Sequence, residues 1–152
     1  MFAQLFNWRT TLAIIAMAIV VVTIFYSNFL SKKIALDEKQ KIEQWLQAVK
    51  EINDTTLTSI SPLASKVFTE NNKDIPMITV TEHDSILDHY NLDTFKINSD
   101  KNYLREQLAE FKGTYDPIVW KNPLDPSQDN RLYYGESSLL KQIRYFPFLI
   151  MN

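Results

Sequence analysis

The most pronounced pattern in the chain is an apolar run without charged residues that covers residues 10–31. A helix rises about 1.5 Å per residue, so about 20 residues cross the roughly 30 Å hydrocarbon core of a bilayer. Arg9 stands before the run and Lys32 and Lys33 follow it, as expected for cations that anchor a helix at both membrane surfaces. The pattern predicts a transmembrane helix over 10–31, preceded by a short segment, residues 1–9. The positive charges on its two sides do not decide which side of the membrane that segment occupies.

A cleaved signal peptide is the alternative for an apolar run so near the amino terminus. Its apolar core would span only about 7–15 residues and would end at a cleavage site flanked by small residues. The run in this chain is longer, and the segment "YSNFLSKK", residues 26–33, offers no such site. An uncleaved membrane anchor is therefore the favoured interpretation.

Beyond the anchor, apolar residues recur at steps of three and four. The clearest of them are Ile42, Trp45, Val49 and Ile52. This spacing is typical of an amphipathic helix, and no glycine or proline separates it from the anchor, so we expect one long helix leading into a helical stalk over 32–72. Two uses of the apolar stripe stay open: it packs on the domain that follows, or it forms a dimer contact with a second copy.

The period of the pattern changes at residue 75. Residues 75–81 and 86–92 are rich in β-branched and other apolar residues and are separated by a short polar turn, which predicts a β-hairpin. A helix capped by Ser99 or Asp100 and closed by Gly113 is expected next. Two more short strands, over 116–120 and 131–137, then lead to a final helix that starts at Ser137 or Ser138. This order predicts an α+β fold, with one helix packed on a small antiparallel sheet in a domain of residues 73–144.

The chain ends in a second apolar run, residues 146–152. We interpret residues 145–152 as the truncated start of a second transmembrane helix, which would place both ends of the domain near one membrane face. The alternative is a terminal helix or strand packed on the domain core, because seven residues are too few to span a bilayer.

Composition removes several classes of function. The chain has no cysteine, only two glycines and a net charge of −2. Thiolate metal sites, cysteine nucleophiles and glycine-rich nucleotide loops are thereby excluded, and there is no basic field for nucleic acid. His83 and His89 lie in the predicted hairpin without the spacing of a metal site. We therefore expect no catalytic, metal-binding or cofactor-binding residues on this chain.

Two segments resemble known proteins. "IPMITVTEHDSILDHYNLD", residues 75–93, is similar to the opening of PAS-like sensor domains, with Asn91 ending the second strand. "PIVW", residues 117–120, with "LYYGESSLLKQIRYFPF", residues 132–148, resembles the close of the extracytoplasmic region in a group of bacterial membrane-bound sensor histidine kinases. In that group, a Tyr-Tyr-Gly-acidic-Ser segment leads through Leu-Leu-Lys and an Arg-aromatic-aromatic-Pro run into the second transmembrane helix.

The resemblance implies the sensory input region of a two-component histidine kinase. It implies a homodimer in the bacterial inner membrane, with residues 1–9 in the cytoplasm and residues 32–144 in the periplasm. An unknown ligand or envelope partner would be the stimulus. The chain has no phosphoacceptor histidine box and no ATP-binding glycine boxes. ATP and a response regulator would therefore be bound only by kinase domains outside this chain. The alternative is a single-span envelope interaction protein with no kinase.

The same resemblance points to residues that would transmit a signal from the sheet to the second span. The candidate coupling residues are Tyr133, Tyr134, Gly135, Glu136, Ser137 and Arg144. The two tyrosines are expected on opposite faces of the last strand, and Gly135 is expected to supply the turn dihedral where strand becomes helix. A structural role and a role in lining a ligand pocket both stay open for them.

Overall fold

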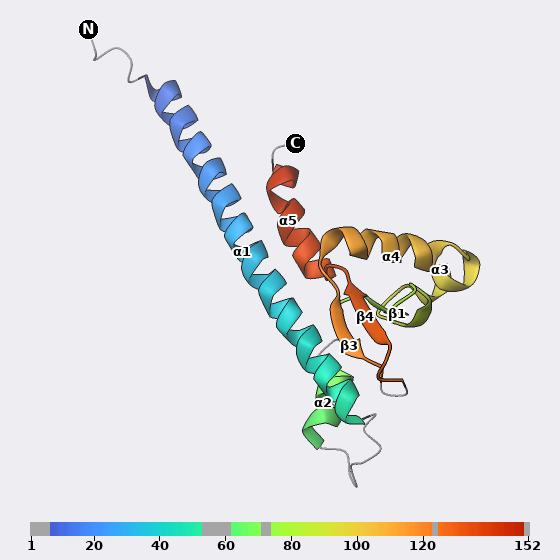
Figure 1. Cartoon of the computed structure of the whole chain (residues 1–152). Coiled ribbons are helices and arrows are strands. Elements are labelled where there is room, and N and C mark those ends of the chain that lie inside the picture. Colours follow the sequence, from blue (N-terminus) through green and yellow to red (C-terminus); the bar gives the residue numbers. More distant parts are fainter. Residues whose placement is uncertain (1–6, 53–61, 71–73, 123–124, 151–152) are drawn as a thin grey trace. The chain divides into compact units, whose positions relative to one another are not determined.

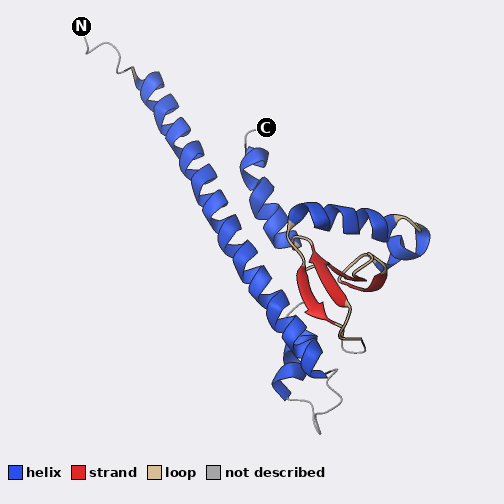
Figure 2. Cartoon of the chain, in the orientation of Figure 1, coloured by secondary structure: helices blue, strands red, loops and turns tan. Residues whose placement is uncertain are grey.

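The structure, a computed structural model, describes residues 7–52, 62–70, 74–122 and 125–150. These residues form helices and an antiparallel sheet, which is the α+β class expected from the sequence (Figures 1 and 2). The helices are α1 (Trp8–Ile52), α2 (Pro62–Glu70), α3 (Thr94–Ser99), α4 (Tyr103–Thr114) and α5 (Ser138–Ile150). The strands are β1 (Met77–Thr81), β2 (Ile86–Tyr90), β3 (Ile118–Lys121) and β4 (Asp129–Tyr134).

The described chain divides into two compact units, and α1 contributes to both. Unit 1 contains α1 up to Leu36 together with the chain from Leu139 onward, which is most of α5. Unit 2 contains residues 37–138 and therefore the whole sheet. Each unit has its own internal contacts, and the candidate site described below lies within unit 2.

The first half of α1 is long and apolar enough to span a membrane. In its most apolar window only 6% of the residues are buried in protein, and side chains such as Met17 (71% exposed) and Phe25 (72% exposed) have no protein cover. An apolar surface of this kind is stable where lipid covers it. The expected continuity from anchor to stalk is confirmed as far as Ile52, because α1 runs for 45 residues. Residues 53–61 and 71–73 of the predicted stalk lie outside the described residues.

The sheet is antiparallel, with the strand order β2-β1-β4-β3. The predicted hairpin is confirmed, since β1 pairs with β2 and places Met77 opposite Tyr90. On its other side β1 pairs with β4, so Met77 also lies opposite Tyr134. Asn91 is the residue predicted to end the second strand. Its side-chain amide, Nδ2, donates to the carbonyl oxygen of Ile75 at 2.8 Å and connects the end of β2 to the residues before β1. Asn91 has a positive φ of 56°, a conformation that asparagine tolerates better than most residues.

Each face of the sheet has its own hydrophobic core, because successive side chains of a strand point to opposite faces. One core joins the stalk part of α1 to the sheet and contains Ile42, Trp45, Leu46, Ile75, Met77, Leu132 and Tyr134. The other lies under α4 and contains Ile78, Val80, Leu108, Phe111 and Tyr133. The sheet is thus covered by a helix on both faces, not by the single helix expected from the sequence.

The start and the end of the middle helix differ from the expectation. Asp93 caps the short helix α3 by accepting from the amides of Phe95 and Lys96, so Ser99 ends α3 and Asp100 follows it. The cap position of α4 is consequently Asn102. Gly113 does not close α4, because the helix continues to Thr114 and no glycine in the described residues has a positive φ.

Candidate functional site

The last strand ends in two tyrosines that lie on opposite faces of the sheet, as predicted. The ring of Tyr134 stacks on Tyr115 with a centroid distance of 4.9 Å and an interplanar angle of 15°. Burial raises the pKa of Tyr134 above its usual value, and the negative charge of nearby carboxylates, first Glu43, raises it further. On the other face, the Nζ of Lys112 lies 5.4 Å from the centroid of the Tyr133 ring. Tyr134 thus belongs to the core between the sheet and α1, and Tyr133 belongs to the core under α4.

Gly135 follows the strand and is required for a reason other than the one expected. Its φ is not positive, so it supplies no turn dihedral that only glycine favours. Instead, a β-carbon at this position would lie 2.5 Å from Cε1 of Phe111 and 3.1 Å from Cγ of Pro76. The amide of Gly135 also donates to the carbonyl oxygen of Pro76 at 2.9 Å. The absence of a side chain thus allows β4, α4 and the start of β1 to meet at one point.

Ser137 and Glu38 form the most buried polar contact at this end of the sheet. The hydroxyl of Ser137 donates to Oε1 of Glu38, and its amide donates to Oε2 at 3.4 Å. Glu38 is 4% exposed and Ser137 is 4% exposed. Burying a carboxylate is costly unless hydrogen bonds compensate, so these two donors account in part for the position of Glu38 inside the protein.

This contact joins the two ends of unit 2. Glu38 lies one residue inside the start of unit 2, and Ser137 lies one residue inside its end. The contact joins positions 99 apart in sequence. The segment that enters the sheet-containing unit and the segment that leaves it are therefore connected by the two hydrogen bonds from Ser137 to the Glu38 carboxylate.

Glu136, the residue before Ser137, carries a second buried carboxylate. It is 8% exposed, and its Oε1 accepts from the hydroxyl of Tyr115 at 3.3 Å. Since Tyr115 also stacks on Tyr134, the stacked pair and the Glu136 carboxylate form one continuous set of contacts beside Ser137. Five of the six predicted coupling residues, Tyr133 to Ser137, form a consecutive buried segment, with Tyr133 and Tyr134 on opposite faces of the sheet. The sixth, Arg144, is exposed and lies in α5.

Glu38 was missed by the sequence reasoning, although a signal for it was present. It stands four residues before Ile42, at the position where the apolar stripe of the stalk would place its next buried residue. A carboxylate at a buried position of an amphipathic helix indicates that a specific donor lies opposite. That donor, Ser137, is far away in sequence and could not be identified without the fold.

The candidate dimer stripe needs a correction. Ile42 is fully buried, Trp45 is 3% exposed, and both belong to the core between α1 and the sheet of the same chain. Val49 packs against that core and Ile52 is half-buried. The stripe thus packs on the domain that follows, which is the first of the two alternatives, and a homodimer would need other surfaces.

The two histidines do not form part of a metal centre among the described residues. In the part of the chain that the structure describes, no group of three or more histidine, cysteine or acidic side chains is placed to hold a metal ion. His83 lies exposed in the turn between β1 and β2, and His89 is half-buried in β2.

No family model, curated protein or solved structure matches this chain.

Proposed function

We propose that this chain is the membrane-anchored sensory input region of a bacterial two-component histidine kinase. In this proposal α1 crosses the inner membrane and the PAS-like domain of residues 73–144 lies in the periplasm. Residues 145–152 begin a second transmembrane helix. The kinase domains, with ATP and the response regulator, lie outside this chain. The observation that carries the proposal is the buried contact between Glu38 and Ser137, which links the helix entering the sheet domain to the segment leaving it.

The mechanism follows from this linkage. A ligand or envelope partner that binds one arrangement of the sheet better than another shifts the population toward it. Because β4 ends at Tyr134 and α5 begins at Ser138, a movement of the sheet reaches α5 through only three residues. The contact with Glu38 makes α1 part of the same movement. Shifts of about 1–2 Å between helices are typical of such transitions.

Contacts within unit 1 support the second span. In this unit α5 lies beside the apolar part of α1, as Figure 1 shows, and the two helices share a hydrogen bond between Ser27 and Ile143. Tyr145 and Phe146 on α5 are 60% and 53% exposed. Exposed aromatic side chains on a helix beside a membrane anchor are typical of the boundary between water and lipid.

A chimaera tests the proposed function. Residues 1–152 would replace the input region of a histidine kinase with a measurable transcriptional output, in frame with its second span. Glu38→Ala removes the acceptor of both Ser137 donors and should change the basal output several-fold. Glu43→Ala is the matched control, since Glu43 lies on the same helix but is exposed and forms a surface ion pair with Lys39 at 4.0 Å. We expect the control to leave the output unchanged.

Equal outputs for the parent chimaera and both variants, at matched membrane levels, would contradict transmission through this contact. A failure of every chimaera to reach the membrane would contradict the anchor itself. Thermal unfolding of the variants separates loss of transmission from loss of folding.

A single-span envelope interaction protein is the second candidate, and one observation favours it. Within the described residues α1 alone passes the length and hydropathy requirements for a membrane span, whereas α5 has 13 residues, fewer than the about 20 that cross a bilayer. The coding frame after Asn152 distinguishes the two candidates. Continued apolar residues followed by a histidine-containing helical box favour the sensor, and a stop codon favours the interaction protein.

A further inference from the structure

Helix α5 contains a proline inside its length, Pro147. Proline has no amide hydrogen, so the carbonyl four residues earlier loses its usual helical donor. In α5 this carbonyl belongs to Ile143. A carbonyl that loses its helical donor in apolar surroundings needs another hydrogen-bond partner.

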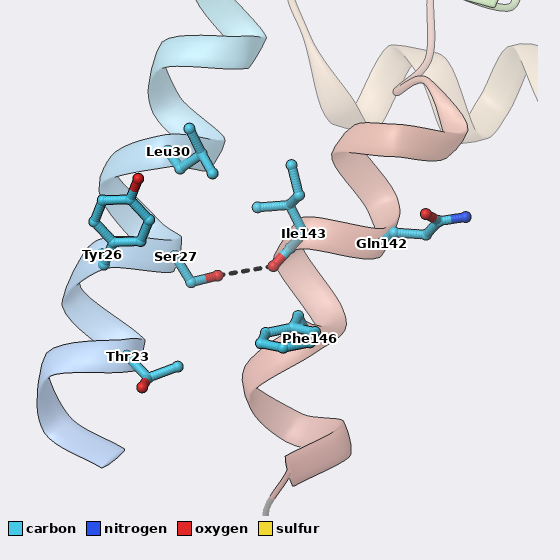
Figure 3. A pocket seen from close by; sticks show the side chains of 7 residues that line it. All are labelled: Thr23, Tyr26, Ser27, Leu30, Gln142, Ile143 and Phe146. Atoms are coloured by element: carbon cyan, nitrogen blue, oxygen red, sulfur yellow. Dashed lines mark hydrogen bonds between the residues drawn. The ribbon is translucent and has the colours of Figure 1, made fainter. Parts of the chain in front are cut away.

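The partner comes from α1. The hydroxyl of Ser27 donates to the carbonyl oxygen of Ile143 at 2.8 Å, as the dashed line in Figure 3 marks. Ser27 is 7% exposed, although Tyr26 beside it is 64% exposed, so the serine faces α5. Thr23, one turn earlier on α1, behaves differently: its hydroxyl donates to the carbonyl oxygen of Ile19 in its own helix at 2.8 Å.

We propose that Ser27 and Pro147 act as a pair. The proline leaves the Ile143 carbonyl without its donor in α5, and the serine hydroxyl donates to that carbonyl instead. One hydrogen bond then sets both the height and the rotation of α5 against α1. A serine can donate to a carbonyl of a neighbouring helix only at matching heights, and a carbonyl engaged by its own helix would gain little from a second donor. The proline therefore makes the contact specific to one position on α5.

The surroundings of the bond allow it to act as a switch. A half-open pocket of about 320 Å³ lies beside it and is lined by Thr23, Tyr26, Ser27, Leu30, Gln142, Ile143 and Phe146 (Figure 3). The two helices therefore leave open space next to the hydrogen bond instead of filling it with side chains. A small rotation of α5 would break the bond without opposing a dense interface. As a regulatory device, this pair rests on the proposed function and would define the resting position of α5.

Carbonyl NMR of the full chain in lipid nanodiscs tests the pair directly. Ile143 is the only isoleucine followed by arginine in the sequence. Labelling isoleucine with ¹³C at the carbonyl and arginine with ¹⁵N therefore isolates the Ile143 carbonyl signal. A carbonyl carbon resonates downfield when its oxygen accepts a hydrogen bond. Ser27→Ala should move this signal upfield, and Thr23→Ala, the matched control, should leave it in place.

The dependence on proline distinguishes the pair from a chance contact. In Pro147→Ala the restored amide of residue 147 can donate to the Ile143 carbonyl within α5. Adding Ser27→Ala in that background should produce at most a small further shift. An unchanged signal in Ser27→Ala alone, or equal shifts in both backgrounds, would overturn the proposal. Either result leaves the chimaera output of the Glu38 variant unaffected, so failure of the pair and failure of the proposed function are distinguishable.

Discussion

The close approach at Gly135 allows one stability change to be worked out from the structure. A β-carbon there would lie 2.5 Å from Cε1 and 2.9 Å from Cδ1 of Phe111, whereas ordinary van der Waals contacts begin at 3.4 Å. Phe111 is 1% exposed and belongs to the core under α4. Its ring must therefore shift by about 1 Å within a filled space, and overpacking of this kind costs about 1–3 kcal/mol.

Gly113→Ala is the matched control, because a β-carbon on Gly113 would meet nothing within 4 Å. Gly113 lies inside α4, where alanine is favoured over glycine by about 1 kcal/mol. The same substitution at the two glycines should thus have opposite effects on the free energy of unfolding. For a domain of about 100 residues, 1 kcal/mol corresponds to roughly 4–8 °C in Tm.

The assay is thermal unfolding of the full chain in lipid nanodiscs, followed by near-ultraviolet circular dichroism. Gly135→Ala should lower the Tm by about 4–24 °C, and Gly113→Ala should raise it by about 4–8 °C. In a Phe111→Leu background the penalty of Gly135→Ala should shrink, because the ring atoms that the new carbon meets are gone. A Gly135→Ala protein as stable as the parent would refute the reasoning from close approach.

Three further predictions concern the same domain. Glu38→Ala leaves the amide and hydroxyl of Ser137 without their acceptor and should destabilise the domain by about 1–3 kcal/mol, whereas Glu43→Ala should change the unfolding free energy by less than about 0.5 kcal/mol; both values follow from urea titration. Trp45→Ala removes a core side chain that meets the ring of Tyr90 at 4.8 Å and should cost about 3–5 kcal/mol in the same titration. Burial, followed by the hydrogen bond to Asp88, raises the pKa of Tyr90 above 10.0, so the stability that the neutral phenol contributes is complete below about pH 10 and lost above it. Tyr90→Phe should therefore flatten the alkaline part of the stability curve, and an identical curve would contradict the pKa shift.

The local elements were readable from the sequence because each has its own pattern. The apolar run before Lys32 predicted the long helix, and alternation in residues 75–81 predicted β1. The helix α3 was not predicted, because its six residues are too few to show a helical period and its signal is a single capping residue, Asp93. The second covering helix was left open as one of two alternatives, since the use of the α1 stripe depends on whether the sheet or a second copy lies against it.

The candidate site was predictable only on one side. Residues 133–137 stood out as a junction, and in the structure they form a buried segment from the end of β4 to the residue before α5. Their partners on other elements, Glu38 and Phe111, are 99 and 24 positions away from Ser137 and Gly135, as the contact and the sequence numbering show. Patterns of apolar and polar residues indicate which positions are buried but not which buried positions meet. The role of Gly135 illustrates this, because the sequence around Gly135 does not show that the ring of Phe111 lies against it.

The central claim is that α1 crosses a membrane and separates the amino terminus from the sheet domain. The chain has no cysteine, so single-cysteine variants can be labelled with a membrane-impermeant maleimide without a background signal. Asn7 and Glu82 are exposed positions before α1 and in the β1–β2 turn. In spheroplasts, Glu82→Cys should be labelled directly, and Asn7→Cys should be labelled only after the membrane is disrupted. Labelling of both residues in intact spheroplasts, or protection of both, would contradict the account.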